Sequence, residues 1–277
     1  MSALADWMVR RDRVLVMGIL NVTPDSFYDG GRYATAAAAI DRGLRMIEDG
    51  ADIIDIGGES TRPGSSPTSR NDELDRVLPV VEGIARQSDV AISIDTSKAE
   101  VARGALDAGA AMVNDVSALR ADVSMAGVVA DAGAFVTLMH MQGEPASMQE
   151  SPTYENVVEE VCAFLEERVR AAVAGGISAE RILIDPGIGF GKRLEHNLDI
   201  LRDIGRLRSL GHPVVCGLSR KSFLGALLDL PAEERLEGTI AANAIAIANG
   251  ADVIRVHDPK EGRRAADVAF RLRRDGP

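Results

Sequence analysis

The sequence predicts an α/β protein: a single-domain (β/α)8 TIM barrel spanning residues 1–277. Eight short apolar runs, bounded by glycine, proline or aspartate, alternate with helix-length amphipathic segments, which is the pattern of a parallel sheet. The last run is as apolar as the interior runs and ends in polar residues, as closure onto the first strand requires. A doubly wound open sheet is the main alternative. The predicted strands are Val14 to Leu20, Ile53 to Ile56, Ala91 to Ile94, Met112 to Val113, Phe135 to Met139, Ile182 to Ile184, Val214 to Cys216 and Val253 to Val256.

A Gly-Ala pair stands before four of these strands. Glycine readily adopts the left-handed conformation that ends a helix, so each pair predicts a helix end followed by a strand. Because these Gly-Ala pairs recur along the whole chain, they argue against a domain boundary. The pairs are Gly50-Ala51, Gly109-Ala110, Gly133-Ala134 and Gly250-Ala251.

Three of the intervening helices can be bounded. Thr35 is a suitable N-cap for an alanine-rich helix that reaches Asp49. A second helix is predicted from Glu155 to Ala174 and a third from Glu233 to Asn249. The second carries apolar residues near helical spacing at Val157, Val161, Phe164, Leu165 and Val169.

Three connections are longer than ordinary barrel turns. The segments Asn21 to Tyr33 and Glu59 to Asn71 follow the first two strands, and we expect them to act as mobile lids over a site. The connection from Gln142 to Tyr154 is also irregular, but its charge pattern indicates no role.

Composition excludes several classes of protein. With 46% hydrophobic and 26% charged residues, the chain has ample material for a globular core. No apolar run approaches the roughly 18–20 residues of a membrane span, and Val14 to Leu20 is too short for a signal peptide, so we expect a cytoplasmic protein. The net charge of -11 argues against nucleic-acid binding. Cys162 and Cys216 are expected to be buried packing residues without a disulfide.

The stretch from Arg181 to Lys192 is the most informative in the chain. An apolar strand ends at Asp185 and breaks into a turn with three glycines. A P-loop is excluded because Pro186 stands where it needs glycine and Arg193 where it needs serine or threonine. The spacing Gly-x-Gly-x-Gly also excludes the dinucleotide fingerprint. We therefore predict that Asp185 is presented at a strand tip to a flat heterocycle, with glycines that let the backbone approach it.

Carboxylates and an amide follow the middle strands. Asp95, Asn114 and Asp185 suit a planar ring that displays an amino group, a ring N–H and acceptors, and form the first predicted subsite. Lys221 lies just after the seventh strand and can face the ring or an anion. For Asp115 we favour a turn residue.

Cations gather at other strand ends. Arg62, Arg220, Arg255 and His257 form a second predicted subsite, for an anion such as phosphate. A structural salt bridge from Arg255 to Asp258 or Asp252 is the alternative for that residue. Of the remaining histidines, His196 and His212 are expected to be solvated, whereas His140 can belong to strand-end packing or to the site.

The chain offers no metal site built from protein ligands alone, because histidine pairs, cysteine clusters and closely spaced carboxylates are lacking. A hydrated Mg²⁺ that arrives on a diphosphate and touches one protein oxygen would leave little trace in a sequence. Asn21 and Asp29 are the available oxygen ligands.

These motifs together resemble the dihydropteroate synthases, over the whole chain. Each motif is weak alone, but the set is specific. The matching stretches are Gly18-Ile-Leu-Asn-Val-Thr-Pro-Asp-Ser-Phe27, Asp55-Ile-Gly-Gly-Glu-Ser-Thr-Arg-Pro-Gly64, Ser93-Ile-Asp-Thr96, Asn114-Asp-Val-Ser117, Met139-His-Met-Gln-Gly143, Asp185-Pro-Gly-Ile-Gly-Phe-Gly-Lys192, Ser219-Arg-Lys-Ser-Phe-Leu-Gly225 and Arg255-Val-His-Asp258.

The resemblance implies a magnesium-assisted, usually dimeric barrel that joins p-aminobenzoate to 6-hydroxymethyl-7,8-dihydropterin diphosphate, and that is a sulfonamide target. It further implies ionisation of the pterin carbon–oxygen bond before the amine attacks. By position, the pterin contacts are Asp95, Asn114, Met139, Asp185 and Lys221, and the magnesium contact is Asn21. The diphosphate contacts are Thr61, Arg255, Val256 and His257, and the p-aminobenzoate pocket comprises Arg62, Pro63, Phe190 and Ser222. Asp29 belongs to the first lid, and the catalytic set is Asp29, Arg62, Asp95, Asp185 and Lys221.

One departure is Tyr28, where the family commonly has serine, which affects only the first lid. The segment Thr61 to Pro63 carries no change associated with drug evasion, so we expect sulfonamide sensitivity. A pterin-binding methyltransferase on the same barrel and a non-catalytic pterin-binding paralogue are the competing readings. The first would have no diphosphate to bind, and the intact cation and lid motifs argue against the second.

Overall fold

The computed structural model describes residues 3–23, 31–59, 68–143 and 147–273. Eight parallel strands form one sheet in the order β6-β5-β4-β3-β2-β1-β8-β7, and an isolated bridge between Ile184 and Val214 closes it into a barrel. Each of the eight predicted runs is a strand, so the predicted TIM barrel is confirmed. The strands are β1 Leu15–Asn21, β2 Ile53–Gly57, β3 Ala91–Asp95, β4 Met112–Asp115, β5 Phe135–Met139, β6 Ile182–Asp185, β7 Val215–Gly217 and β8 Val253–Val256.

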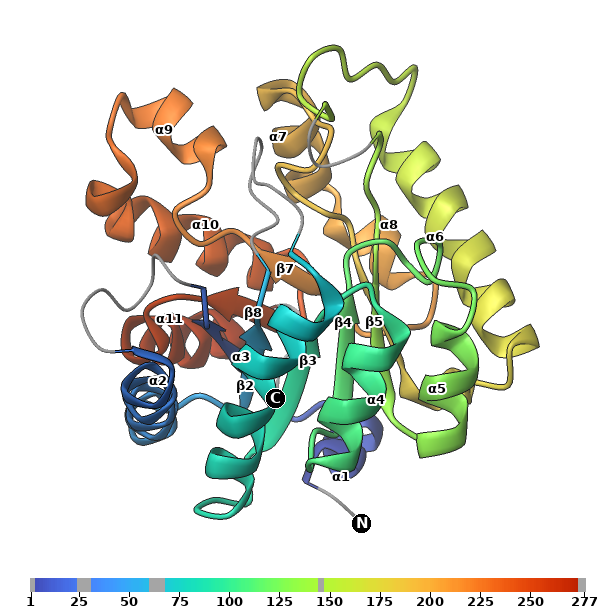
Figure 1. Cartoon of the computed structure of the whole chain (residues 1–277). Helices are drawn as coiled ribbons and strands as arrows, with labels where there is room; N and C mark the ends of the chain where they lie inside the picture. The colour runs from blue at the N-terminus through green and yellow to red at the C-terminus, as the bar shows by residue number, and fades with distance from the viewer. Residues whose placement is uncertain (1–2, 24–30, 60–67, 144–146, 274–277) are drawn as a thin grey trace.

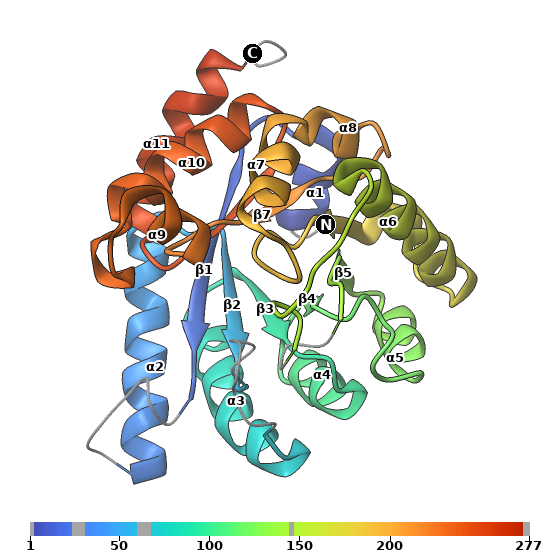
Figure 2. The same cartoon turned by 90° about the horizontal axis from the view of Figure 1, so that it is seen from above.

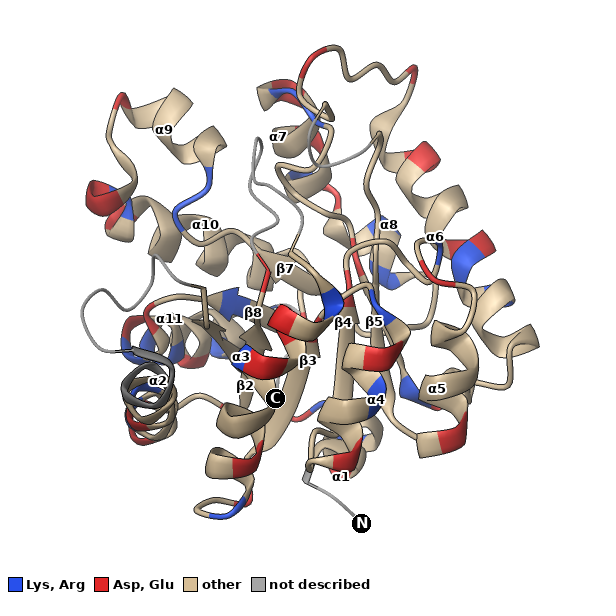
Figure 3. Cartoon of the chain, viewed as in Figure 1, with Lys and Arg blue, Asp and Glu red and all other residues tan. Residues whose placement is uncertain are grey.

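Helices form an outer layer around the strands (Figures 1 and 2). Acidic and basic residues are interspersed along these helices (Figure 3). No helix among the described residues is long and apolar enough to span a membrane. The α-helices are α1 Ala3–Arg10, α2 Gly31–Glu48, α3 Arg70–Ala85, α4 Ala99–Asp107, α5 Met125–Ala132, α6 Val157–Ala174, α7 Leu194–Arg202, α8 Ile204–Arg208, α9 Ser222–Leu228, α10 Leu236–Ala248 and α11 Pro259–Leu272.

All three predicted helix starts differ from those of the structure. Helix α2 begins at Gly31, so Thr35 lies inside the helix, where it costs little, rather than at its cap. The helix predicted from Glu155 begins at Val157, because the Asn156 side chain accepts the amide of Glu159 and acts as the N-cap. The segment predicted to start at Glu233 is first a short 3₁₀ turn, and α10 begins only at Leu236.

The Gly-Ala pairs end helices as predicted. All four glycines have positive φ, at 97°, 114°, 57° and 125°. In each pair the glycine amide donates to the carbonyl three residues back and the alanine amide to the carbonyl five residues back, as Gly50 to Ile47 and Ala51 to Met46 illustrate. This is the Schellman arrangement. Gly176 and Ile177 make the same bonds after α6, a fifth case that the sequence pattern missed.

The inside of the barrel changes character from one end to the other. At the amino ends of the strands the inward side chains are apolar and pack against Leu4 and Trp7 of α1. These interior residues are Leu15, Met17, Ile53, Met112, Phe135, Leu183, Val215 and Val253. We call them the apolar plug. Because the plug fills one end, the barrel can offer a ligand only its other end.

Candidate active site

Inward positions at the carboxyl ends of the strands are polar. Strand register places Asn21 beside Gly57, Gly57 beside Asp95 and Asp95 beside Asn114. On the other side of the barrel, Met139 pairs with Asp185 and Gly217 with Arg255. Because side chains alternate along each strand, the polar residues of this end face the same space. The structure therefore brings together Asp95, Asn114, Asp185 and Arg255, as predicted.

Arg255 joins the two predicted subsites. Its Nε lies 2.6 Å from Asp55 Oδ2 and its Nη2 lies 2.6 Å from Asp95 Oδ2. The alternative of a salt bridge to Asp258 or Asp252 is therefore wrong. Burial raises the pKa of Asp95 to about 7, while the Arg255 guanidinium opposes that rise. The anion side and the ring side of the site share one cation.

Asp55 is a site residue that sequence reasoning missed. It is fully buried, and its Oδ2 accepts from Arg255 Nε and from Asn114 Nδ2, the latter at 3.3 Å. The predicted site residues follow apolar runs, whereas Asp55 stands within one, between Ile54 and Ile56. A charged residue inside an otherwise apolar strand was the available signal, because a carboxylate is seldom buried without a partner.

Asp185 lies at the floor of the site. Only 6% of the residue is exposed, and its Oδ1 accepts the amide of Gly187 at 2.7 Å. Burial raises its pKa, and the positive charge of Lys221 is the largest opposing influence. Lys221 Nζ donates to the carbonyl of Ile188 and lies 4.7 Å from the centre of the Phe190 ring. An acid, a cation and an aromatic face thus meet at this side of the site.

The glycines after Asp185 approach the protein's own backbone. A Cβ on Gly187 would lie 1.9 Å from the carbonyl oxygen of His140, and one on Gly191 would lie 2.3 Å from that of Gln142. The expectation that these glycines make room for a ligand is therefore wrong for both. Gly189 differs, because its nearest neighbour is Lys221 Cδ at 3.3 Å.

Buried Lys192 holds this loop in place. Its Nζ lies 2.8 Å from His140 Nδ1 and donates to the carbonyls of Gly187 and Phe190, both at 3.0 Å. Burial, followed by the charge of Lys192, lowers the pKa of His140 to about 2, so this histidine is neutral at any working pH. The question left open for His140 is settled in favour of packing, beneath the loop that carries Phe190.

Gly187→Ala is expected to destabilise the protein by more than about 3 kcal/mol, because the new methyl group meets backbone and the residue has φ of +65°. Gly133→Ala is the matched control: its φ is +57°, but no atom lies within 4 Å of the added Cβ, so only about 1 kcal/mol is expected. Chemical denaturation of both variants measures the difference. Equal losses would show that backbone conformation alone, and not the contact with His140, requires glycine at 187.

Lys221 gives the site a pH limit. Burial lowers its pKa from 10.5 to about 8, against the opposing effect of Asp185. We expect kcat/KM to fall as pH rises above about 8, because the cation is then lost. The pKa of Lys221 is lower in the folded protein than in the unfolded chain, so the charged lysine destabilises the folded state below pH 8. This destabilisation decreases as pH rises from about 8 to 10.5. Lys221→Arg, which stays charged, should remove the alkaline limb, and a wild-type profile flat to high pH would contradict the assignment.

Arg220 is paired with an acid. Its Nε and Nη2 each lie 3.0 Å from an Asp258 oxygen, and its contact with an anion stays a prediction. His257 remains at the mouth of the barrel, with Nδ1 2.9 Å from the Ser219 hydroxyl. The predicted turn role of Asp115 is confirmed, because its carboxylate accepts the amides of Ser117 and Leu119, both at 2.8 Å.

The other predicted residues occupy different depths. Met139 is buried in a small cluster with Met141 and Met148, and Phe190 packs against it. Val256 is buried on the outer side of the sheet, so only its backbone can face a ligand. Ser222 is exposed at the first turn of α9. The residues predicted in the two lids, Asp29, Thr61, Arg62 and Pro63, lie outside the described residues.

An ion-pair cluster contains Glu59, which directly precedes segment 60–67. Lys98 Nζ is 2.6 Å from both Glu59 Oε2 and Glu73 Oε2, and Glu59 Oε1 accepts the amide of Thr68 at 2.7 Å. Glu59 thus links the two ends of segment 60–67. In the sequence Glu59 is recognisable only as the first residue of the second predicted lid, and no local pattern indicates its partners.

The remaining histidines and cysteines have packing roles. His196 packs edge-on against Tyr154, and His212 is half-buried near the carbonyl of Ile182. The prediction that both histidines are solvated is therefore wrong. Cys162 and Cys216 are free and buried, which confirms their predicted role.

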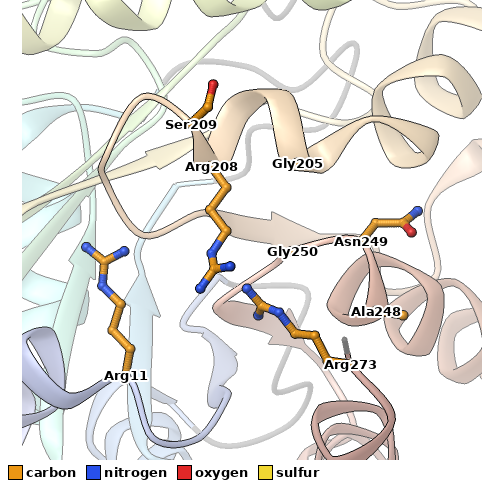
Figure 4. A pocket seen from close by; sticks show the side chains of 8 residues that line it. All are labelled: Arg11, Gly205, Arg208, Ser209, Ala248, Asn249, Gly250 and Arg273. Carbon is orange, nitrogen blue, oxygen red and sulfur yellow. The ribbon is translucent and has the colours of Figure 1, made fainter. Parts of the chain in front are cut away.

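A surface cavity of about 520 Å³ lies at the opposite end of the barrel. Three arginines, Arg11, Arg208 and Arg273, point into it, as Figure 4 shows. Its other lining residues belong to α8, to the end of α10 and to the residues that follow these helices. Arg208 and Arg273 both face Asp252, at 3.7 and 3.5 Å, so we assign these arginines to the stability of that end and not to the active site.

The barrel is closed, and an apolar plug fills one end. Acids, an amide and cations are gathered at the other end. These features define the class of the protein, a TIM-barrel enzyme with its site at the carboxyl ends of the strands. Residues 17–257 match the family described as pterin binding enzyme. Dihydropteroate synthase from Synechocystis sp. is 45% identical over 98% of this chain and 93% of its own.

Two solved structures are also similar over nearly their whole length. Dihydropteroate synthase from Yersinia pestis in complex with a sulfonamide drug gives a TM-score of 0.90 at 44% identity, with 95% of both chains covered. The Xanthomonas albilineans enzyme with 4-aminobenzoic acid gives 0.89 at 47% identity, covering 96% of this chain and 95% of that one. The chain belongs to the dihydropteroate synthase family of pterin-binding enzymes.

Proposed function

We propose that this protein condenses p-aminobenzoate with 6-hydroxymethyl-7,8-dihydropterin diphosphate, forming 7,8-dihydropteroate and diphosphate. The observation that carries the proposal is the polar end of the barrel, where Asp95, Asn114 and Asp185 share one space with Arg255 and Lys221. Carboxylates there match the donors of a pterin ring, and the cations match its oxygens and the diphosphate. The family of the chain and the 4-aminobenzoic acid bound to its Xanthomonas relative favour this reading over a methyltransferase.

Recognition of the ring follows from hydrogen-bond chemistry. Asp95 and Asp185 accept from the amino group and ring N–H groups, while Lys221 donates. Asn114 directs its Nδ2 toward Asp55, which leaves its carbonyl oxygen for the ring. Met139 supplies an apolar, polarisable contact beside the site. In a buried site each of these polar contacts is stronger than in water.

Arg255 is suited to couple the two halves of the substrate. Its guanidinium is already fixed by Asp55 and Asp95, so it enters the reaction without reorganisation. When the ring donates hydrogen bonds to Asp95, Arg255 still has donors left for the diphosphate, because a guanidinium carries five N–H groups. His257 at the same mouth adds a second contact for that anion.

The described residues fit a magnesium ion that is bound mainly by substrate. They contain no group of three or more His, Cys, Asp or Glu side chains arranged to hold a metal. Asn21 Oδ1 and the Asp95 side chain both lie over Gly57, within 3.7 Å of the position its Cβ would occupy, so one amide oxygen is available at the mouth. Mg²⁺ commonly keeps waters and phosphate oxygens around one protein ligand. When bound, the ion would neutralise charge that develops on the diphosphate.

The reaction needs charge stabilisation more than proton transfer. The bond between the pterin methylene carbon and the diphosphate oxygen breaks, and its electron pair leaves with the diphosphate. Arg255 and His257 stabilise the leaving anion, and Asp95 and Asp185 stabilise the pterin cation. The p-aminobenzoate nitrogen then forms the new bond and releases one proton. A neutral arylamine is nucleophilic without a base, which agrees with the lack of an activated nucleophile among the described site residues.

A homodimer and a cytoplasmic location belong to the same proposal. Helices α10 and α11 pack side by side and expose Ile245, Val268 and Leu272 at 57%, 62% and 77%. Large exposed apolar side chains on adjoining helices are typical of a protein interface. Sedimentation analysis of the protein and of Val268→Lys tests the dimer, which the charge should weaken. The cytoplasmic location remains a prediction from the sequence.

Steady-state turnover is the direct test of the function. Purified protein should form dihydropteroate from both substrates, lose most of its rate when magnesium is chelated, and be inhibited by a sulfonamide in competition with p-aminobenzoate. Methyl transfer from a methylated folate, measured in parallel, tests the alternative. Folded protein that binds pterin but forms no dihydropteroate under these conditions would overturn the proposal in favour of a non-catalytic paralogue.

A further inference from the structure

A layer of polar side chains lies inside the barrel between the apolar plug and the active site. Strand register pairs Asp55 with Ser93 on neighbouring strands β2 and β3. It also pairs Asn114 with Thr137 on β4 and β5. Their outward neighbours, such as Ile54, Ile94 and Val136, pack against the helices, so these polar side chains point inward. We call Asp55, Ser93 and Thr137 the inner polar layer.

The inner polar layer is sealed from solvent. Asp55, Ser93 and Thr137 each have 0% exposure. The apolar plug lies on one side of the layer. On the other side, Arg255 and Asn114 reach across to Asp55 Oδ2. The layer is therefore separate from the surface of the site that receives substrate.

Three atoms of this layer have unused hydrogen-bonding capacity. Within the part of the chain that the structure describes, Asp55 Oδ1, Ser93 Oγ and Thr137 Oγ1 have no hydrogen-bond partner. Native proteins rarely bury such atoms unpaired, because each costs stability. The three residues lie on β2, β3 and β5, and Asn114 of the intervening β4 pairs with Thr137 and donates to Asp55. Three such atoms within one stretch of the barrel interior indicate a shared ligand and not three separate defects.

We propose that the inner polar layer is a binding site for ordered water. Water can donate to the carboxylate, which only accepts, and can both accept from and donate to the two hydroxyls. Buried waters typically make about three such bonds. A cation is disfavoured because the Arg255 guanidinium already lies 2.6 Å from the same carboxylate, and an apolar guest would leave all three atoms unpaired.

Water at this position would act as a positioning element for the proposed function. A bond to Asp55 Oδ1 fixes the carboxylate rotation, and its Oδ2 then holds both Arg255 Nε and Asn114 Nδ2. Asn114 is thereby kept with its oxygen toward the ring, although the layer itself touches no substrate. This consequence rests on the proposed function, whereas the water site itself does not.

Thr137→Val provides the test, because the two side chains have the same shape and differ by the hydroxyl. If Thr137 bonds a water, the variant without substrate should melt about 2–4 °C lower than wild type. If the hydroxyl is buried without a partner, its removal should raise the melting temperature, and this result would overturn the proposal. Ser93→Ala is measured alongside, and the two changes combined should lose less than the sum of the single losses, because they share the water.

Two further readouts separate the parts of the proposal. A high-resolution crystal structure of the unmodified protein should show water density within hydrogen-bond distance of Thr137 Oγ1 and Asp55 Oδ1. A dry layer there would refute the site even if Thr137→Val fails to fold. Calorimetry with 6-hydroxymethylpterin should show about 5- to 10-fold weaker binding to Thr137→Val. A lower melting temperature of Thr137→Val with unchanged pterin affinity would support the water site but would show that it does not position Asn114.

Discussion

Arg255→Met is expected to destabilise the protein by about 3–5 kcal/mol and to reduce turnover below detection. The arginine is the partner of two carboxylates, each 2.6 Å away, and Asp55 is fully buried. Methionine fills much of the volume but leaves both acids without a counter-charge in a poorly hydrated site. Catalysis fails for a separate reason, since the leaving diphosphate loses its main cation. Chemical denaturation and steady-state turnover measure the two losses independently.

The double variant Asp55→Asn/Arg255→Met separates these effects. Removing the buried charge of Asp55 together with its partner should restore most of the lost stability, because an uncompensated carboxylate is the costly species. Turnover should stay undetectable. If the double variant regains activity along with stability, Arg255 would serve only to neutralise Asp55, and its assignment to the diphosphate would be wrong.

Asp185→Asn is expected to lower kcat/KM for the pterin diphosphate by about 10²–10³-fold. The substitution keeps the shape and the acceptor for the Gly187 amide but removes the charge that stabilises the pterin cation. It should also lower the pKa of Lys221 further, because Asp185 is the largest influence that holds that pKa up. The alkaline limb of the pH profile should therefore move to lower pH.

Asp252→Asn is the matched control for Asp185→Asn. Asp252 is a comparably buried acid, with 4% exposure, but lies at the opposite end of the barrel and accepts the amide of Val214. It should lose stability while kcat/KM stays within about 2-fold of wild type. Similar kinetic losses in the two variants would show that general destabilisation, and not the charge at Asp185, explains the effect.

Much of the fold could be predicted because its signals are local. Each strand is a short apolar run, and the Gly-Ala pairs mark helix ends through a backbone conformation that glycine adopts readily. Helix starts were less predictable, because α2 begins upstream of the favourable cap at Thr35 and α6 begins two residues after Glu155. Cap preferences are weak compared with packing of the rest of a helix.

The site was predictable as a set of strand-end residues but not as a set of partners. Asp95, Asn114 and Asp185 follow strands, and parallel strands bring their carboxyl ends together. Which cation meets which acid depends on how the ring closes. Arg220 and Arg255 both follow strands, yet one pairs with Asp258 and the other reaches across the barrel. Such pairings join residues up to 200 positions apart, and no local pattern encodes them.

The seam between β6 and β7 has a consequence for how the ring site can adapt. Other neighbouring strands share ladders of three to five residue pairs, whereas β6 and β7 meet only at the Ile184–Val214 bridge. Pro213, next to that bridge, has no N–H to extend it. Asp185 ends β6, and Lys221 follows β7. The barrel therefore has the fewest inter-strand backbone hydrogen bonds where Asp185 and Lys221 face each other. Amide hydrogen exchange should be fastest along this seam and should slow once a bound pterin contacts both sides.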